Sequence, residues 1–404
     1  MKKISGWIFS AHCIPIFLVA TGARANPNDA LQLSASYSIS HTDNLFLLSK
    51  SRDAQALIGR SSAAETIHAT TAGLNFDKDY GLQNVKLNVN AVNYDYKNFG
   101  YLGFTALNYT GTFGWSLTPR FRGSVFADRQ ENLSGFNDFR NYTVRNKRIA
   151  TTTRAQGLYE LDGTWQVIGS VYRQEVKNSA TIIEQRAFST DSVDAGLKKV
   201  FPSGSEIVYT IRRGSGDYSD ASFATQLFLP SSYTETENQL NVRWFLSAKT
   251  LLNARVSYLQ KNFGNYDFRD YSGLNASSTL FWSVSPRVDL AITLSRQIAD
   301  YQTVYSSYVE SDRIAFAPSW QIKEKLKLIF NQEFSHRNFK GATPVGATNV
   351  QRSDHLNLTR LSIEWEPREK MQLSAWFQRN NRSTNFTGFD FNARTIGLLA
   401  QISF

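Results

Sequence analysis

The sequence predicts an all-β fold, a transmembrane antiparallel up-and-down β-barrel of about 18 strands, or of 16 if one weak pair near residues 188–199 does not form. Three observations predict it: short polar turns recur about every forty residues, the segments beside them alternate apolar and polar residues, and tryptophans gather near the turns. Alternation with a period of two gives each strand one apolar and one polar face, which suits a wall between lipid and water. We expect short periplasmic turns and longer extracellular loops.

The first 25 residues predict a signal peptide. Lys2 and Lys3 form a basic start, residues 8–19 are apolar, and Ala23-Arg24-Ala25 is a small-x-small cleavage site. We therefore expect two segments, a signal peptide at 1–25 and an outer-membrane β-barrel at 26–404. The one cysteine, Cys13, lies in the first segment, so the expected mature chain has neither a disulfide nor a thiolate metal site.

Charge and hydropathy exclude several classes of protein. The formal charge of +10 falls to +7 on cleavage, because residues 1–25 carry three basic residues and no acidic one. The remaining basic residues are scattered along an exported chain, so we expect no nucleic-acid partner. Beyond the signal peptide no stretch of about 18 apolar residues could form a membrane-spanning helix. A mean hydropathy of −0.34 suits barrel strands, of which only one face is apolar.

Eight short turns divide the chain, and their Pro, Gly, Asp and Asn residues are typical of tight turns. They are predicted at residues 80–84, 118–120, 161–164, 201–204, 247–250, 285–287, 323–325 and 366–369. Longer loops are predicted near 42–62, 133–147, 214–233 and 340–353. Pro318 lies on the apolar face of its strand, where we expect a bulge or a local break in pairing.

Aromatic residues predict two girdles, one at each membrane interface. Six tryptophans lie within about four residues of a short turn: Trp115, Trp165, Trp244, Trp282, Trp320 and Trp365. Tyrosines and phenylalanines collect at the other strand ends, namely Phe99, Tyr101, Tyr266, Phe268, Tyr271, Tyr301, Tyr305, Tyr308 and Phe339. A soluble β-sandwich would not explain why tryptophan favours one end.

The last sixteen residues form one alternating stretch that ends in Phe404. Such a terminal strand would be an aggregation hazard in water, but it is sensible if its apolar face meets lipid. A terminal Phe after alternating apolar residues resembles the signal by which outer-membrane barrels are assembled. That resemblance makes the barrel assembly machinery and outer-membrane lipid the expected partners.

No pattern for catalysis, cofactor binding or metal binding is present, so we expect no enzyme, no cofactor and no metal ion. The sequence has no HExxH, Gly-x-Ser-x-Gly, P-loop or dinucleotide-binding pattern. Asp354 and His355 could orient an imidazole for hydrolysis, but a chance neighbour pair on a polar loop is far commoner. Residues 214–217 read as a flexible loop, because no helix follows them as a phosphate site requires.

Basic residues fall on the polar face of several strands and are candidates for lining the pore. These are Arg122, Arg154, Arg243, Arg255 and Lys327. Asp128, Glu160, Asp289 and Glu333 share that face. The set therefore predicts either a wall of mixed charge or a modest basic excess that favours anionic solutes.

Two stretches carry a family resemblance. Residues 33–48 end in Asp43-Asn44-Leu45-Phe46 and resemble the opening strand of the porin-2 superfamily of outer-membrane β-barrels. Within it, the run from Trp115 to residue 175 looks like the EpsL barrels encoded in exopolysaccharide biosynthesis operons. The resemblance implies a Gram-negative outer-membrane location with both termini periplasmic. It also implies passive export of exopolysaccharide through a polar lumen, with the polysaccharide and periplasmic export components as partners. The alternatives are a small-solute diffusion porin, an outer-membrane enzyme, and a non-conducting structural barrel.

Overall fold

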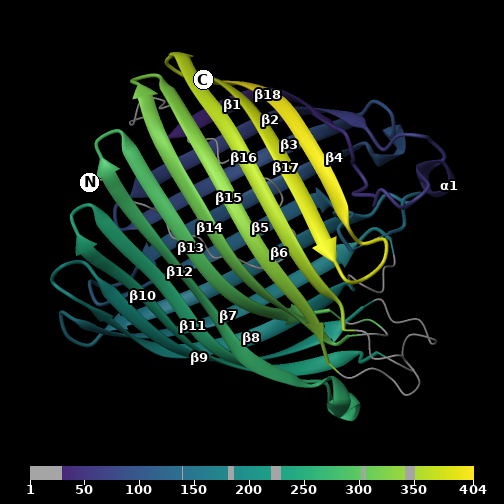
Figure 1. Cartoon of the computed structure of the whole chain (residues 1–404). Coiled ribbons are helices and arrows are strands. Elements are labelled where there is room, and N and C mark those ends of the chain that lie inside the picture. The colour runs from purple at the N-terminus through teal and green to yellow at the C-terminus, as the bar shows by residue number, and fades with distance from the viewer. Residues whose placement is uncertain are drawn as a thin grey trace.

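The protein is a closed antiparallel barrel of eighteen strands in a computed structural model (Figure 1). The structure describes residues 30–404 except 139, 181–185, 220–228, 302, 304–305 and 342–350. The predicted signal peptide at 1–25 lies outside these residues. The strands are β1 Leu31–Thr42, β2 Glu65–Tyr80, β3 Gln83–Tyr96, β4 Phe104–Ser116, β5 Phe121–Leu133, β6 Lys147–Glu160, β7 Trp165–Asn178, β8 Phe188–Val200, β9 Glu206–Tyr218, β10 Ser232–Ser247, β11 Thr250–Asn262, β12 Tyr271–Ser285, β13 Val288–Asp300, β14 Tyr308–Lys323, β15 Leu326–Lys340, β16 Ser353–Arg368, β17 Met371–Thr384 and β18 Phe391–Ser403.

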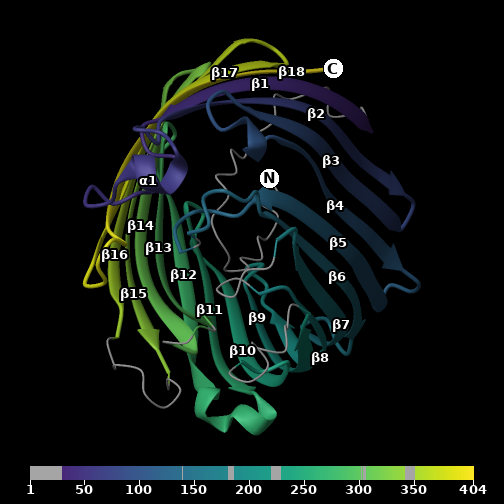
Figure 2. The ribbon, with the colours of Figure 1, turned by 90° about the vertical axis from the view of Figure 1, so that its right-hand side faces the viewer.

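Every strand pairs with its two neighbours in the sequence, and β1 pairs with β18 to close the ring (Figures 1 and 2). At the closure Phe404 exchanges backbone hydrogen bonds with Leu33, of 2.8 Å and 3.4 Å. Closure satisfies the backbone N–H and C=O groups that an open edge would leave unpaired in lipid. The predicted fold and its count of 18 strands are confirmed, and residues 188–200 form the full strand β8.

In the loop residues that the structure describes there are three short helices: α1 Ala54–Ile58, η1 Gly100–Leu102 and η2 Gly264–Arg269. Within the described residues no helix is of a length and apolarity that would carry it across a membrane. Asp53 caps α1 by accepting a hydrogen bond of 2.9 Å from the N–H of Gln55, and Gly59 ends it in the left-handed conformation.

The eight predicted turns all connect neighbouring strands. The last differs in position, because β16 continues to Arg368 and the chain reverses at residues 369–370, where Lys370 has φ of 66°. Its pairing with β17 shifts register between Trp365 and Arg368, so a bulge absorbs Pro367 within the strand. Pro318 produces the expected local break, since β14 skips two pairs with β15 and resumes in the same register.

The loop prediction for residues 214–217, which also begin the longer loop predicted near 214–233, is wrong. Residues 214–217 are the last part of β9, which extends to Tyr218. Its glycines fit a strand here because Gly214 and Gly216 face crowded neighbours, where a side chain would meet Ser192 and Tyr233. Composition alone suggested a loop, whereas close approach to the adjacent strands accounts for these glycines.

The register separates the two faces of the wall. The large apolar side chains that remain exposed, such as Leu107, Val125 and Leu398, point outward, while Asn and Ser on the other parity point into the barrel. All six predicted interface tryptophans lie on the outward parity near the short-turn end. Trp115 covers Gly123 of the neighbouring strand, which leaves no room for a side chain there. Contact of the six rings with a membrane stays a prediction.

The second aromatic girdle, expected at the loop end, is wrong for several of its members. Phe99, Tyr271 and Phe339 are buried, with exposed fractions of 4%, 7% and 3%. They pack inside the barrel mouth or in its loops, since strand-end position alone does not say which face a ring takes. Tyr305 lies outside the described residues.

Candidate functional site

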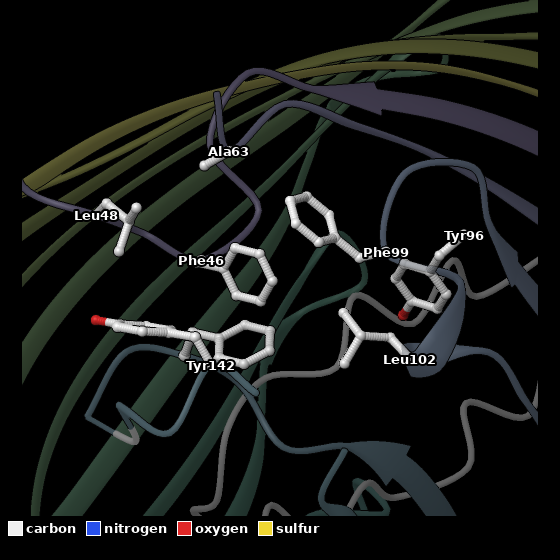
Figure 3. Close-up of a cluster of buried hydrophobic side chains, with 8 residues drawn as sticks. Phe46, Leu48, Ala63, Tyr96, Phe99, Leu102 and Tyr142 are labelled. Atoms are coloured by element: carbon white, nitrogen blue, oxygen red, sulfur yellow. The ribbon is translucent and has the colours of Figure 1, made fainter. Parts of the chain in front are cut away.

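Three loops fold inward and share one apolar cluster at the loop end of the lumen. The cluster joins the β1–β2, β3–β4 and β5–β6 loops, and Figure 3 shows Phe99, Leu102 and Tyr142 gathered around Phe46. Phe46 is fully buried and makes edge-on contacts with Phe99 and with Phe136, each at 4.7 Å between ring centroids. We call these residues and their loops the plug. Burial of such rings stabilises loops that would otherwise be mobile.

A buried carboxylate, that of Glu65, holds the β3–β4 loop of the plug in place. Glu65 is fully buried and accepts hydrogen bonds from the backbone N–H groups of Asn98 and Phe99, of 2.9 and 2.7 Å. The β3–β4 loop is thereby tied to the start of β2. This contact supports Phe99 in the position where it meets Phe46.

The β5–β6 loop is anchored to the far wall by Asp138. Its carboxylate accepts hydrogen bonds from Arg337 at 3.0 Å, Arg352 at 2.7 Å and Arg382 at 3.3 Å. Arg337 belongs to β15, Arg382 to β17, and Arg352 directly precedes β16, whereas the loop leaves the wall between β5 and β6. The loop therefore crosses the lumen. We call Asp138 and the three arginines the anchor.

Further contacts surround the anchor. Arg352 also binds Asp354 at 2.6 Å and lies over the ring of Phe389 at 4.2 Å. Arg382 donates to the carbonyl of Asn137 at 2.6 Å and is buried completely. Burial alone would raise the pKa of Asp138, but the guanidinium groups of Arg337, Arg352 and Arg382 outweigh it and hold that pKa well below 3.8.

Guanidinium groups outnumber carboxylates around the anchor. Arg140 lies over the ring of Phe389 at 3.4 Å, and its electrostatic neighbours include Arg52 and Arg352. Burial lowers the pKa of Arg140, as expected for a cation moved out of water among other cations. We call the part of the lumen that the β5–β6 loop crosses beside the anchor the constriction. The excess of guanidinium groups gives it a positive local potential, which favours anions in its neighbourhood.

A second network runs along the inner wall at mid-height. Arg154 and Arg212 both pair with Asp194, at 3.5 and 3.3 Å, and Arg212 and Arg255 both pair with Glu237, at 3.5 and 2.8 Å. The charges alternate across strands β6 to β11, so most of them are neutralised by a neighbour. Arg313 and Glu333 form a further pair at 2.5 Å.

The five pore-lining candidates all lie on the inward parity, but they do not come together. Arg154 and Arg255 belong to the mid-height network. The other three are near the short-turn end: Arg122 pairs with Glu160 at 3.6 Å, Arg243 lies over Phe245 at 5.0 Å, and Lys327 is opposite Glu364. Their part in conduction stays a prediction.

Sequence reasoning missed the anchor, Arg212, Asp194 and Glu237. The parity of β8, β9 and β10 could have found the last three, since all fall on the polar faces of their strands. Nothing local marks Asp138, which is one polar residue in a polar loop.

Asp354 and His355, which the sequence offered as a possible catalytic pair, do not contact each other through their side chains. Asp354 points inward and is fully buried against Arg352, while His355 points outward, where its ring lies 4.3 Å from that of His336. Neighbouring residues of a strand face opposite sides, so the carboxylate cannot orient the imidazole. Within the described residues no three His, Cys, Asp or Glu side chains gather to hold a metal ion.

Comparison with known proteins agrees with this architecture. Residues 245–404 match the family described as "Putative beta-barrel porin 2". No curated protein matches the chain. The resemblance to EpsL barrels is not shown by these matches and stays a prediction.

Several solved porins share the fold at low sequence identity. OccK2 (OpdF) of Pseudomonas aeruginosa is similar at 12% identity and a TM-score of 0.51, over 92% of this chain and 98% of that one, and it has also been crystallised with glucuronate. A BenF-like porin from Pseudomonas fluorescens Pf-5 is similar at 10% identity and a TM-score of 0.52, over 93% and 99%. OccAB4 of Acinetobacter baumannii gives 11% and 0.50, over 94% and 100%. The chain therefore has the closed β-barrel fold of these solved porins, and its C-terminal residues 245–404 match the beta-barrel porin 2 family.

Proposed function

We propose that the protein is a passive diffusion channel for small hydrophilic solutes, with a preference for anions. The observation that carries the proposal is the β5–β6 loop, which is held across the lumen by the contacts of Asp138 with Arg337, Arg352 and Arg382. A wall of eighteen strands encloses a wide lumen, and a loop across that lumen restricts the size of what can pass. This arrangement suits small solutes better than a thick polymer.

The preference for anions is supported by the charges of the constriction. Arg140 and Arg52 lie beside an anchor that already holds three guanidinium groups against Asp138 and Asp354. Charged rings in a narrow passage set the selectivity of a pore. Glucuronate, a small carboxylate, is bound by OccK2, whose fold is similar, and serves here as a suitable test solute.

Bilayer recording tests the proposal. We expect the purified barrel to form stable channels whose reversal potential in a KCl gradient shows preference for chloride, and to carry glucuronate into liposomes. Substitution of Arg140 with Gln should weaken chloride preference, whereas Arg213→Gln, which alters an exposed residue on the outer face of β9, should leave it unchanged. A purified barrel that gives no channels would contradict the proposal.

Exopolysaccharide export, the principal expectation from the sequence, requires the β5–β6 loop to leave the lumen. Deletion of the gene in its native host tests this directly. Periplasmic accumulation of polymer with loss from the medium would favour export, while normal export together with slower uptake of small anions would favour the diffusion channel. The fold of the solved porins supports the second outcome.

A further inference from the structure

The outer face of strands β11 to β17 carries a groove of about 790 Å³. Most of the residues that line it form two rows across the strands, in which each residue is paired with the next and the side chains point outward. One row is Val256, Ala276, Arg296, Asp312, His336, His355 and Ser383, and the other is Ala254, Ser278, Leu294, Ile314, Phe334, Asn357 and Asn381. The groove therefore crosses the strands instead of running along one of them.

The groove changes from apolar to polar along its length. Near β11 it is lined by Ala254, Val256 and Ala276, and near β17 by Asn357, Asn381 and other polar groups. In the middle an exposed ion pair, Arg296 with Asp312 at 3.7 Å, forms part of the lining. Leu294, Ile314 and Phe334 between them are 46–52% exposed on the outer face. An elongated amphiphile, with a hydrocarbon chain at one end and a polar head at the other, matches this gradient.

The groove also changes depth in the wall. Val256 lies six residues from the loop end of β11, while Ser383 is next to Thr384, the last residue of β17. With strand tilts of about 35–45° and a rise of about 3.3 Å per residue, the apolar end is roughly 12 Å deeper than the polar end. By the same count Asn381 lies three residues and Arg379 five residues from the loop end of β17, so both are deeper in the wall than Ser383.

Two arginines lie beside the polar end. Arg379 and Arg394 are directly opposite each other on β17 and β18, both outward and exposed, one row below Asn381 and Asn392. Neither guanidinium forms an ion pair within the part of the chain that the structure describes. Like charges directly opposite each other destabilise a sheet unless an anion lies between them. The row beneath, Phe377 and Ile396, is apolar.

We propose that this groove, with Arg379 and Arg394, binds lipid A, the phosphorylated glycolipid of the outer leaflet. A phosphate bridges the two guanidinium groups, the hydroxyls of the sugar meet Asn357 and Asn381, and an acyl chain follows Phe334, Ile314 and Leu294. Arginine favours phosphate because its planar group donates two parallel hydrogen bonds. The assignment uses the orientation with long loops outside the cell, and it does not depend on what the lumen conducts.

Native mass spectrometry of the folded barrel in detergent, with added diphosphoryl lipid A, tests the site. We expect the wild-type barrel to bind lipid A and the double variant Arg379→Gln/Arg394→Gln to bind it at least tenfold more weakly. Arg213→Gln is the matched control, since Arg213 is also outward and exposed near the loop end, but on β9. Its binding should equal that of the wild type.

Two further comparisons separate the parts of the site. Ala276→Trp, which fills the apolar end from outside, should weaken lipid A binding without changing channel conductance. Phosphatidylglycerol should bind more weakly than lipid A. Equal binding of lipid A by wild type and both variants would overturn the site, and equal binding of the two lipids would overturn the assignment to lipid A.

Discussion

The Nη1 atom of Arg382 donates a hydrogen bond of 3.3 Å to the Oδ1 atom of Asp138, although 244 positions separate the two residues. Arg352 reaches the same oxygen at 2.7 Å and Arg337 the other oxygen at 3.0 Å. One carboxylate thus joins three strands of the far wall to a loop from the near wall. Together with the hydrogen bond from Arg382 to the carbonyl of Asn137, this carboxylate holds the loop against the far wall.

Replacement of Asp138 with Asn should release the loop. Loss of the carboxylate leaves the buried Arg337 without its ion-pair partner, while Arg352 and Arg382 still pair with Asp354. Breaking a buried ion pair in this way typically costs about 3–5 kcal/mol. We expect larger and noisier single-channel conductance with an unchanged barrel on a heat-modifiability gel. Asp128→Asn serves as control, because Asp128 is inward but bonds only to Thr110 and Gln130 among the described residues. Identical conductance of the Asp138 variant and the wild type would show that the loop does not limit flow.

The depressed pKa of Asp138 makes the anchor insensitive to mild acid. A carboxylate with a lowered folded-state pKa contributes stability that is present above its unfolded value of 3.8 and is lost as the pH falls through the lower folded value. We therefore expect constant conductance from about pH 8 to about pH 5, with opening only in strongly acidic solution. Single-channel recording across this range is the measurement. A change of conductance above pH 5 that is absent in Asp138→Asn would contradict the assigned pKa direction.

The barrel could be predicted because its turns and strand faces depend on residues close together in the sequence. The constriction could not, because it depends on contacts between residues far apart in the sequence. Pro119 and Pro286 mark turns by their own geometry, and the parity of Leu107 or Leu398 fixes which face meets lipid. Phe99 carries no such signal, because a ring at a strand end can turn outward to lipid or inward to the plug. Asp138 meets partners 199 to 244 positions away, so no window of sequence contains the site.

Phe46 should be the residue on which the plug depends most. Its ring is fully buried and contacts Phe99, Phe136 and Tyr142 from two other loops. Replacement by Ala removes these contacts and leaves a cavity, at a cost of about 3–5 kcal/mol to loop packing. We expect faster cleavage of the loops by protease added to the folded barrel, with the strands left intact. Phe268→Ala is the control, since Phe268 is 46% exposed on η2; equal cleavage of the two variants would mean that the cluster does not hold the loops.

Gly123 should tolerate no side chain, because the neighbouring strands of the barrel wall leave no space for one. A Cβ atom there would meet the carbonyl oxygen of Gln156 and the indole of Trp115, which covers the glycine from the adjacent strand. Overpacking of this kind costs about 1–3 kcal/mol, and here the backbone oxygen cannot move aside without disturbing the β5–β6 pairing. Gly123→Ala should therefore lower the temperature at which the folded band on a gel converts to the unfolded one. Gly163→Ala, in a turn with nothing within 4 Å of the added atom, should leave that temperature unchanged. Equal melting of both variants would mean that Trp115 and the strand adjust freely, and the ring would then contribute to the membrane interface without fixing the sheet beneath it.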